Sequence, residues 1–344
     1  MDEVRQMLST LSRAVGTSGA EESVIRAIKG YLSNDWDAKT DTAGNLLVTV
    51  CSPQPGCPHL LLDAHMDEIG MVVTEITEEG FLRVAACGGI DRKWLPAQEV
   101  TVHGLEPLSG VICAIAPHLQ SKKEQNQVPE WNNILIDIGF SKQEAQKRVS
   151  PGTRVAIVSP PASLGGSFIS GKAMDNRAGV TAILLAAKRL QRLNCPCGVS
   201  LLFSAEEEIA GKGASVGAFG LSPNVAISVD VSFAQTPGIP THQTGQWKKG
   251  PMIGISPTLT KWVSDQLSAV AREQQIPHQY EVMGGATSTN ADHLGLTGRG
   301  IPVGLCSIPE RYMHTPVETV AISDIEDTAQ LLSAFAISLC QEGN

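Results

Sequence analysis

Four short, nearly continuous apolar runs constrain the fold of this chain more than any other feature. They cover residues 60–62, 199–203, 225–229 and 303–306. Strands that lack a polar side must be covered on both faces, so these runs predict strands of a buried sheet. Apolar residues recur at helical spacing at 180–190, 259–270 and 325–339. The alternation predicts an α/β fold in which helices cover both faces of the sheet.

The N-terminal part of the chain also has a helical pattern. Residues 1–15 are charged and have helical periodicity. The segment from Ser18 to Glu21 has the spacing of a capping box, and Val24, Ile25 and Ile28 follow it on one helical face. We therefore expect a helix that begins near residue 19.

Residues 69–159 differ from the rest of the chain. Strand-like alternation recurs at 69–73, 81–85, 100–102, 111–116 and 155–158, with glycine and proline between the runs. The stretch 117–133 is polar and aperiodic, as in a long surface loop. Because 344 residues exceed what one core usually fills, we expect two domains. One is discontinuous, 1–68 and 160–344, and the other is a small β-barrel inserted at 69–159.

Composition argues against several classes of partner. The net charge of −9 and the pI near 5.4 argue against a nucleic-acid or anionic-membrane partner. Residues 1–15 lack the pattern of a secretory signal, and no run approaches about 18 consecutive apolar residues. The eight cysteines are scattered, often in apolar runs, and Cys195-Pro196-Cys197 lacks Cys-x-x-Cys spacing. We expect free thiols and a cytoplasmic location.

Histidine and acidic residues follow all four predicted strands. His65 and Asp67 follow the first strand, Glu206, Glu207 and Glu208 the second, Asp230 the third, and His314 lies shortly after the fourth. Taken singly, each has an ordinary explanation, such as a turn residue or a solvated helix start. Taken together they indicate a site, because ligands of open α/β sheets bind at the carboxyl ends of the strands.

Asp175 adds a carboxylate just before the helix predicted at 180–190, where its alternative role is an N-cap. Two imidazoles with three or four carboxylates suit two divalent cations about 3.5–4 Å apart that share one carboxylate. The pattern therefore predicts a dimetal site with positions left open for water and substrate.

The sequence blocks around these residues resemble those of the tetrahedral (TET) and glutamyl aminopeptidases, which are cocatalytic metallopeptidases. The blocks are AHMDEIG, GKAMDNRAG, EEIAGKGA, VDVSFAQTPG and RYMHTPVE, in order over nearly the whole chain. The resemblance implies a zinc-peptidase-like α/β/α sandwich with a mixed sheet, and a barrel used for dimerisation. It also implies cleavage of N-terminal residues from peptides, two zinc or cobalt ions per subunit, and a homo-dodecamer built from dimers.

The same resemblance assigns roles to single residues. One metal would be held by His65, Asp175 and Asp230, and the other by Asp175, Glu208 and His314, so that Asp175 bridges. Glu207 would be the general base, and Glu206 a neighbour that contacts neither metal. Asp67 would accept a hydrogen bond from the second ring nitrogen of His65 and so orient the imidazole.

Two positions depart from the family pattern. Asn290 lies in Ser-Thr-Asn-Ala, where members usually carry Gly-Thr-Asp-Ala, and we expect this change to affect substrate preference. Lys212 stands where arginine is common. Since lysine cannot reproduce the planar fork of arginine, we expect a local contact to differ.

Other functions fit the same residues. A deacylase or amidase on this scaffold would share the metal chemistry and would act on acylated rather than free amines. A non-catalytic binding or assembly protein could keep the metals for structure, but a structural site would need neither Glu207 nor Asp67. Glycoside hydrolysis, with which some family members are labelled, normally uses two metal-free carboxylates and is not expected here.

Overall fold

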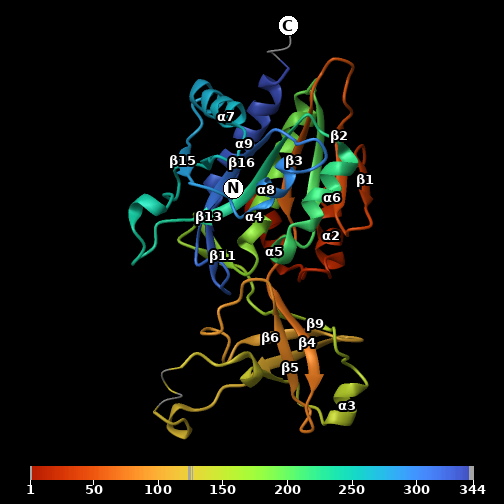
Figure 1. The fold of residues 1–344 in the computed structure, drawn as a ribbon, viewed down its shortest axis with the longest axis vertical. Helices are drawn as coiled ribbons and strands as arrows, with labels where there is room; N and C mark the ends of the chain where they lie inside the picture. Colours follow the sequence, from red (N-terminus) through yellow and green to blue (C-terminus); the bar gives the residue numbers. More distant parts are fainter. Residues whose placement is uncertain (1, 123–124, 126, 341–344) are drawn as a thin grey trace.

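The computed structural model describes residues 2–122, 125 and 127–340. These residues form a larger α/β lobe and a smaller β lobe (Figure 1). The larger lobe is built on an 11-stranded sheet, and the smaller one is a closed barrel. The predicted α/β fold with a small β-barrel is thereby confirmed.

The apolar runs correspond to the central strands of the sheet. β12 (Gly198–Ser204), β3 (His59–His65), β13 (Val225–Phe233) and β16 (Val303–Arg311) lie side by side in this order and are parallel. The flanking strands, which the sequence analysis does not predict, are β1 (Asp37–Thr40), β2 (Leu46–Cys51), β10 (Ala162–Leu164), β11 (Phe168–Gly171), β14 (Met252–Ile255), β15 (Gln279–Val282) and β17 (Glu318–Ala321). Because the central strands are parallel, their carboxyl ends meet at one edge of the sheet.

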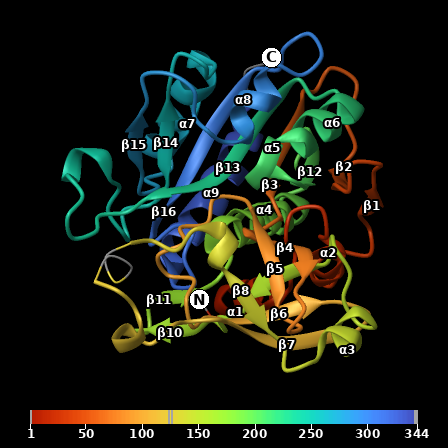
Figure 2. The same cartoon turned by 60° about the horizontal axis from the view of Figure 1, so that its bottom comes forward.

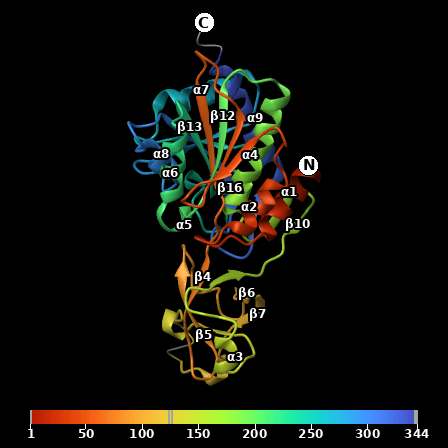
Figure 3. The same cartoon turned by 90° about the vertical axis from the view of Figure 1, so that its right-hand side faces the viewer.

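Helices cover both faces of this sheet (Figure 3). On one face lie α1 (Asp2–Arg13), α2 (Glu22–Lys29), α4 (Met174–Arg192), α7 (Lys261–Glu273) and α9 (Ile322–Ser338). On the other lie α6 (Lys212–Leu221) and α8 (Asn290–Gly295), and the remaining helices are α3 (Lys142–Gln146) in the barrel lobe and α5 (Glu207–Ala210). The helices predicted at 180–190, 259–270 and 325–339 are confirmed as α4, α7 and α9. The described part of α1 agrees with the helical pattern of residues 1–15.

The expected capping box at the start of α2 is wrong. The helix begins at Glu22, and Glu21 occupies the N-cap position without a side-chain cap. The carboxylate of Glu21 instead accepts a hydrogen bond from the backbone N–H of Gly19 at 2.7 Å, and the hydroxyl of Ser18 donates to Asp67 at 2.7 Å. Both side chains are thus used by the site rather than by the helix.

The barrel closes in the strand order β4-β5-β8-β7-β6-β9, and Figure 2 shows the end of the molecule that carries it. Its strands are β4 (Gly70–Ile76), β5 (Leu82–Cys87), β6 (Glu99–His103), β7 (Pro107–Ile112), β8 (Leu135–Asp137) and β9 (Arg154–Ile157). Met71, Val84 and Ile136 belong to a core that is separate from those of the sheet. The barrel strands lie within 69–159, which we retain as the proposed bounds of an inserted domain.

The loop expected at 117–133 is only partly described. Residues 123, 124 and 126 lie outside the described residues. The described remainder includes 3-10 turns at Pro117–Leu119 and Trp131–Asn133, so the stretch is less irregular than its composition suggests.

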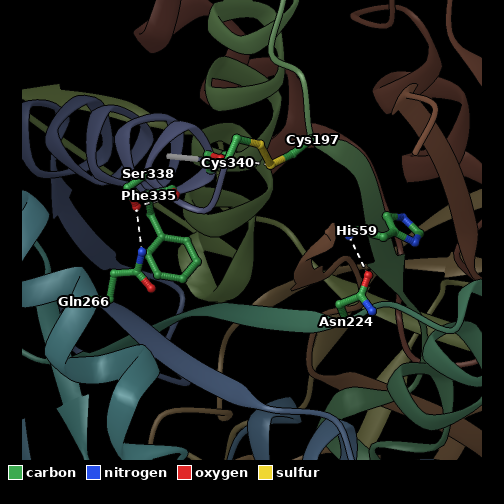
Figure 4. The surroundings of a disulfide bond; sticks show 8 residues. His59, Cys197, Asn224, Gln266, Phe335, Ser338 and Cys340 are labelled. Carbon is green, nitrogen blue, oxygen red and sulfur yellow. Dashed lines mark hydrogen bonds between the residues drawn. A yellow bond between two sulfur atoms is a disulfide. The ribbon is translucent and has the colours of Figure 1, made fainter. Parts of the chain in front are cut away.

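The expectation of free thiols is wrong for two of the cysteines. Cys197, just before β12, forms a disulfide with Cys340, just after α9, with their Cα atoms 6.3 Å apart (Figure 4). The other six cysteines are free. The pairing could not be read from the sequence because 143 residues separate the two positions. Within residues 2–122, 125 and 127–340, none of the helices has the length and apolar character needed to span a membrane.

Candidate active site

The five residues implied as metal ligands lie together at the carboxyl ends of the central strands. His65 ends β3, Glu208 follows β12 in α5, Asp230 lies in β13, His314 lies in the loop after β16, and Asp175 lies at the start of α4. β13 continues beyond Asp230 to Phe233, so this aspartate does not end its strand as the sequence suggests. α5 lies at the end of the larger lobe that faces the barrel (Figure 1).

Asp175 is at the centre of the arrangement. Its Oδ1 lies 3.0 Å from Nε2 of His65, and its Oδ2 lies 3.3 Å from Nε2 of His314. Asp230 Oδ1 is 3.7 Å from the same nitrogen of His65, and Glu208 Oε2 is 3.3 Å from that of His314. Two groups of possible ligands result, His65–Asp175–Asp230 and Asp175–Glu208–His314, with ligand atoms within 4.8 Å of one another in each. The structure therefore brings together both sets that the resemblance implies.

The two imidazoles are oriented as metal ligands require. Nδ1 of His314 lies 3.0 Å from the carbonyl oxygen of Gly89, which can only accept, so Nδ1 carries the hydrogen. Nδ1 of His65 lies 3.3 Å from Oδ1 of Asp67 but has no hydrogen-bond partner among the described residues, so the expected hydrogen bond is only a close approach. A neutral ring that carries its hydrogen on Nδ1 would leave the lone pair of Nε2, on the side of the carboxylates, free to bind a cation. The donor set thus fits two divalent cations.

The pKa values reflect the crowding of charge. Burial raises the pKa of Glu208 to about 6, and Asp175 adds to this effect. Burial alone would lower the pKa of His314, but Asp175 and Glu208 raise it to about 11. Burial is likewise outweighed at His65, where Glu207, Asp175 and other carboxylates raise the pKa well above its usual value. Protons on the imidazoles therefore balance the carboxylates here, and bound cations can take over that role.

Glu207 lies beside both groups and belongs to neither. Its Oε2 is 3.9 Å from Nε2 of His65, and its side chain is 15% exposed, compared with 5% for Glu208. Burial, opposed by His65 and reinforced by Asp230, raises the pKa of Glu207 to about 9. A carboxylate that faces the site and remains accessible has the position that a general base needs.

Asp67 has more partners than its expected contact with His65. Its buried carboxylate accepts hydrogen bonds from the backbone N–H groups of Glu207 at 3.0 Å and Glu208 at 3.2 Å. It also accepts the hydroxyl of Ser18 at 2.7 Å. Asp67 therefore holds the first turn of α5 against the end of β3, which places both glutamates relative to His65.

Sequence reasoning missed the segment around Ser18 and Glu21. Oε1 of Glu21 accepts a hydrogen bond from the backbone N–H of Glu206 at 3.3 Å, in addition to that of Gly19. The only signal was the Ser-x-x-Glu spacing, which favours a helix start when it is considered alone. The segment instead supports the backbone on which Glu207 lies.

A buried ion-pair cluster behind the site was also missed. Nζ of Lys172 lies 2.6 Å from Oε2 of Glu68, and Nη2 of Arg177 lies 3.9 Å from Oε1 of the same residue. Glu68 also accepts the backbone N–H of Gly16 at 2.9 Å. Since Lys172 and Arg177 flank Asp175 in the chain, the cluster fixes the start of α4 to the segment after β3.

Two further buried glutamates lie near the site. Glu318 accepts the backbone N–H of His314 at 2.9 Å and that of Asp175 at 3.2 Å, so it joins the segments that carry two possible ligands. Glu310 has no hydrogen-bond partner for either carboxylate oxygen among the described residues. Burial and the nearby Glu318 raise its pKa well above the usual range, which favours a neutral side chain.

The structure accounts for both departures from the family pattern. Lys212 pairs with Oε2 of Glu206 at 2.7 Å, and Glu206 belongs to neither group of ligands. Asn290 is 1% exposed and donates to the hydroxyl of Ser204 at 2.8 Å. The side chain of Asn290 thus bonds within the fold, and its expected effect on substrate preference stays a prediction.

Comparisons with known proteins agree with this geometry. A family model described as M42 glutamyl aminopeptidase matches residues 44–331. Lysyl aminopeptidase of Pyrococcus furiosus is 29% identical over 340 residues, which cover 96% of each chain. An aminopeptidase from the archaeon Desulfurococcus kamchatkensis has a TM-score of 0.92 at 31% identity, covering 99% of this chain and 96% of its own. The TET1 peptidase of Pyrococcus horikoshii, which can assemble into a tetrahedron or a large octahedral shell, has a TM-score of 0.86 at 31% identity, covering 97% and 99%.

Proposed function

Because the chain belongs to the M42 glutamyl aminopeptidase family and is an aminopeptidase, we propose that it cleaves residues from free N-termini with the help of two divalent cations. The observation that supports this best is the placement of Asp175. Its two carboxylate oxygens face two different histidines, at 3.0 Å and 3.3 Å. A carboxylate shared by two adjacent groups of ligands is typical of paired-cation sites.

We assign one cation to His65, Asp175 and Asp230, and the other to Asp175, Glu208 and His314. Imidazole and carboxylate ligands suit zinc or cobalt. When bound, such a pair lowers the pKa of a water molecule and polarises the scissile carbonyl group. With no more than three protein residues in each set, the residues would leave positions open for water and substrate on bound cations.

Glu207 is the general base in this proposal. Its carboxylate takes a proton from the attacking water and delivers it to the leaving amine, so that a C–O bond forms as the peptide C–N bond breaks. Asp67 has a positioning role, because its Oδ1 lies 3.3 Å from Nδ1 of His65 and accepts the backbone N–H of Glu207.

Release of amino acids from short peptides with free or acetylated N-termini tests the proposal. The enzymes compared are the metal-loaded protein, a chelated sample and Glu207→Gln, with Glu206→Gln as a matched control because Glu206 pairs with Lys212 instead. We expect release from free N-termini only, loss with chelator, and a fall of about 100-fold or more for Glu207→Gln. Glu206→Gln should retain near wild-type activity.

The alternatives give different results in the same experiment. Activity restricted to acetylated substrates would support the deacylase or amidase. No metal-dependent activity on either series would support a non-catalytic metal-binding protein. Equal losses for both glutamine variants would contradict the assignment of Glu207.

We also propose a homo-dodecamer built from dimers through the barrel, which is supported by the dodecamer of PhTET1-12s and by the tetrahedron formed by the TET1 peptidase of Pyrococcus horikoshii. Size-exclusion chromatography with light scattering of the full chain at micromolar concentration tests this, and a monomer there would contradict it. We infer a cytoplasmic location from the six free cysteines. In a reducing cytoplasm the disulfide between Cys197 and Cys340 would be opened, so the buried Cys197 should be alkylated when cells are quenched under denaturing conditions, whereas a persistent disulfide there would contradict this location.

A further inference from the structure

A second polar cluster lies beneath the possible metal ligands, on the face of the sheet that α8 covers. It consists of Asp63 on β3, Ser204 on β12, Ser228 on β13 and Asn290 at the start of α8. All four are at most 1% exposed. A buried carboxylate and amide at this depth need defined partners, because each unsatisfied polar atom is costly.

The hydrogen bonds within this cluster have a fixed direction. Nδ2 of Asn290 donates to the hydroxyl of Ser204 at 2.8 Å, and that hydroxyl donates to Oδ1 of Asp63 at 2.8 Å. Ser228 donates to the other oxygen of Asp63 at 3.4 Å. Because the hydroxyl of Ser204 has a single hydrogen, it can satisfy a carboxylate on one side only, and the other side must supply a donor.

Position 290 offers no support for a negative charge. Oδ1 of Asn290 already has no hydrogen-bond partner among the described residues. An aspartate there would add a second carboxylate next to a hydroxyl that is committed to Asp63. Two buried carboxylates around one donor repel each other, and one would have to take up a proton.

The cluster also joins the strands that carry the site. Asp63 precedes His65 by two residues on β3, and Ser228 precedes Asp230 by two residues on β13. Ser204 ends β12 just before α5. The hydrogen bonds between these side chains therefore hold the ends of three adjacent strands in register, directly below three groups that the proposed function uses.

We propose that Asp63 and Asn290 form a reciprocal carboxylate–amide pair across Ser204. The pair tolerates one carboxylate but not two, and it positions His65, Asp230 and the start of α5. The positioning part rests on the proposed function. The pairing itself does not, since it concerns only the folded chain. Asn290 is thus a partner of Asp63 across Ser204.

A double-mutant cycle on the metal-free protein tests the pairing. The variants are Asn290→Asp, Asp63→Asn and the double variant, and the readout is the midpoint of thermal unfolding. In the wild-type background, Asn290→Asp should lower the midpoint by roughly 5 °C or more, because it buries an uncompensated charge. In the Asp63→Asn background the same substitution should lower the midpoint of thermal unfolding clearly less. The amide introduced at position 63 can donate to Ser204, whose hydroxyl can then turn to the carboxylate introduced at position 290.

A matched control uses another buried amide near the site. Asn45 is fully buried and bonds Asp41, Ala205 and Gly213 rather than Ser204. The changes that Asn45→Asp and Asp63→Asn cause in the unfolding midpoint should therefore be additive. If Asn290→Asp alone does not fold, recovery of folded protein by the double variant is the readout. The pairing would be overturned if Asn290→Asp lowered the unfolding midpoint equally in both backgrounds, or if the double variant did not recover folded protein.

The positioning role is tested by cobalt binding, which needs no turnover. At a temperature where all variants are folded, Asn290→Asp should weaken cobalt affinity roughly tenfold and shift the visible absorption bands of the cobalt-loaded protein. The double variant should recover both readouts relative to Asn290→Asp. Unchanged affinity and spectrum in Asn290→Asp would show that the pair supports the fold but does not position the ligands. Failure of the proposed peptidase activity would leave these results unaffected.

Discussion

Ser18 shows how much a single hydroxyl can contribute when its partner is a fully buried carboxylate. It donates to Oδ2 of Asp67, the oxygen that also accepts the backbone N–H of Glu208. The carbonyl group of Ser18 in turn accepts Nε of Arg154 in the barrel strand β9 at 3.1 Å. Ser18 therefore links the barrel to the aspartate that holds α5, although it contacts no proposed metal ligand through its side chain.

We predict that Ser18→Ala lowers kcat about tenfold with a smaller change in KM, because Asp67 loses a hydrogen bond that holds it in place. Ser18→Thr, which keeps the hydroxyl, should recover most of the activity. Steady-state kinetics on a peptide with a free N-terminus provide the measurement. Ser268→Ala is the control, since this buried serine donates to the backbone of α7. An equal loss of kcat in both alanine variants would contradict a specific role for Ser18.

The possible ligands could be found from sequence because each is a histidine or carboxylate next to a recognisable strand. His65 and Asp230 are examples, since the apolar runs of β3 and β13 mark their positions. The supporting residues could not be found in this way. Ser18, Glu68 and Asn290 act through contacts between segments far apart in the chain, and nothing local distinguishes them from ordinary turn or helix-start residues.

At the scale of elements, the segment before α2 supports the start of α5 and does not cap α2 through its side chains. The short helix α5 has only Glu207–Ala210, and its N-cap, Glu206, has a left-handed backbone and no side-chain cap. The carboxylates of Glu21 and Asp67 accept the backbone N–H groups of Glu206, Glu207 and Glu208 instead. Acceptors from two other segments thus satisfy the N–H groups that a short helix leaves free.

The charge of Glu21 should oppose folding at alkaline pH. Burial raises the pKa of Glu21 to about 7, from an ordinary value of 4.5. An acid whose pKa is raised in the folded state destabilises that state above the folded pKa and has no such effect below the unfolded one. We predict that Glu21→Gln, which keeps an acceptor oxygen, matches or exceeds the unfolding midpoint of the wild-type protein at pH 8 and gives no gain at pH 4.5.

Two variants control this measurement of unfolding midpoints. Glu21→Ala removes the acceptor as well and should be less stable than Glu21→Gln at both pH values. Glu22→Gln changes an exposed neighbour and should leave the pH dependence as it is. A gain for Glu21→Gln that is the same at both pH values would contradict a charge effect.

Short helices and strands could not be predicted from sequence patterns. Long apolar or periodic stretches correctly predicted β3, β12, β13, β16, α4, α7 and α9. α5, α8 and β8 are too short to show a period, with four, six and three residues. Their conformations depend on contacts with other segments, such as the hydrogen bonds of α5 to Asp67, and therefore could not be predicted from local sequence.

For the whole molecule, contacts between the barrel and the larger lobe lie beside the site. The barrel segment supplies the carbonyl group of Gly89 to His314, and a β-carbon at Gly89 would lie only 2.7 Å from Nδ1 of that ring. The inserted domain thus helps to orient a possible ligand in the other lobe. A relation of this kind follows from the assembled fold and is not visible in the composition of residues 69–159.

The stability of the whole chain should depend on pH in opposite ways with and without cations. Without them, the folded state holds protons at Glu207, whose pKa is raised to about 9, mainly by burial, and at His314, whose pKa is raised to about 11 because Asp175 and Glu208 outweigh burial. Both pKa values lie above the ordinary 4.5 and 6.5. The folded state therefore binds more protons than the unfolded chain, and stability falls as pH rises from about 6 to 9.

Cation binding has the opposite dependence, because its ligands must be deprotonated and protons compete less as pH rises. We therefore predict that a chelator lowers the midpoint of thermal unfolding more at pH 8.5 than at pH 6. Scans of the metal-loaded and chelated protein at both pH values measure this difference. Glu207→Gln should reduce the pH dependence of the chelated protein, because it removes one of the groups that holds an extra proton. A chelator effect that is equal at the two pH values, or larger at pH 6, would mean that these side chains do not exchange protons for cations.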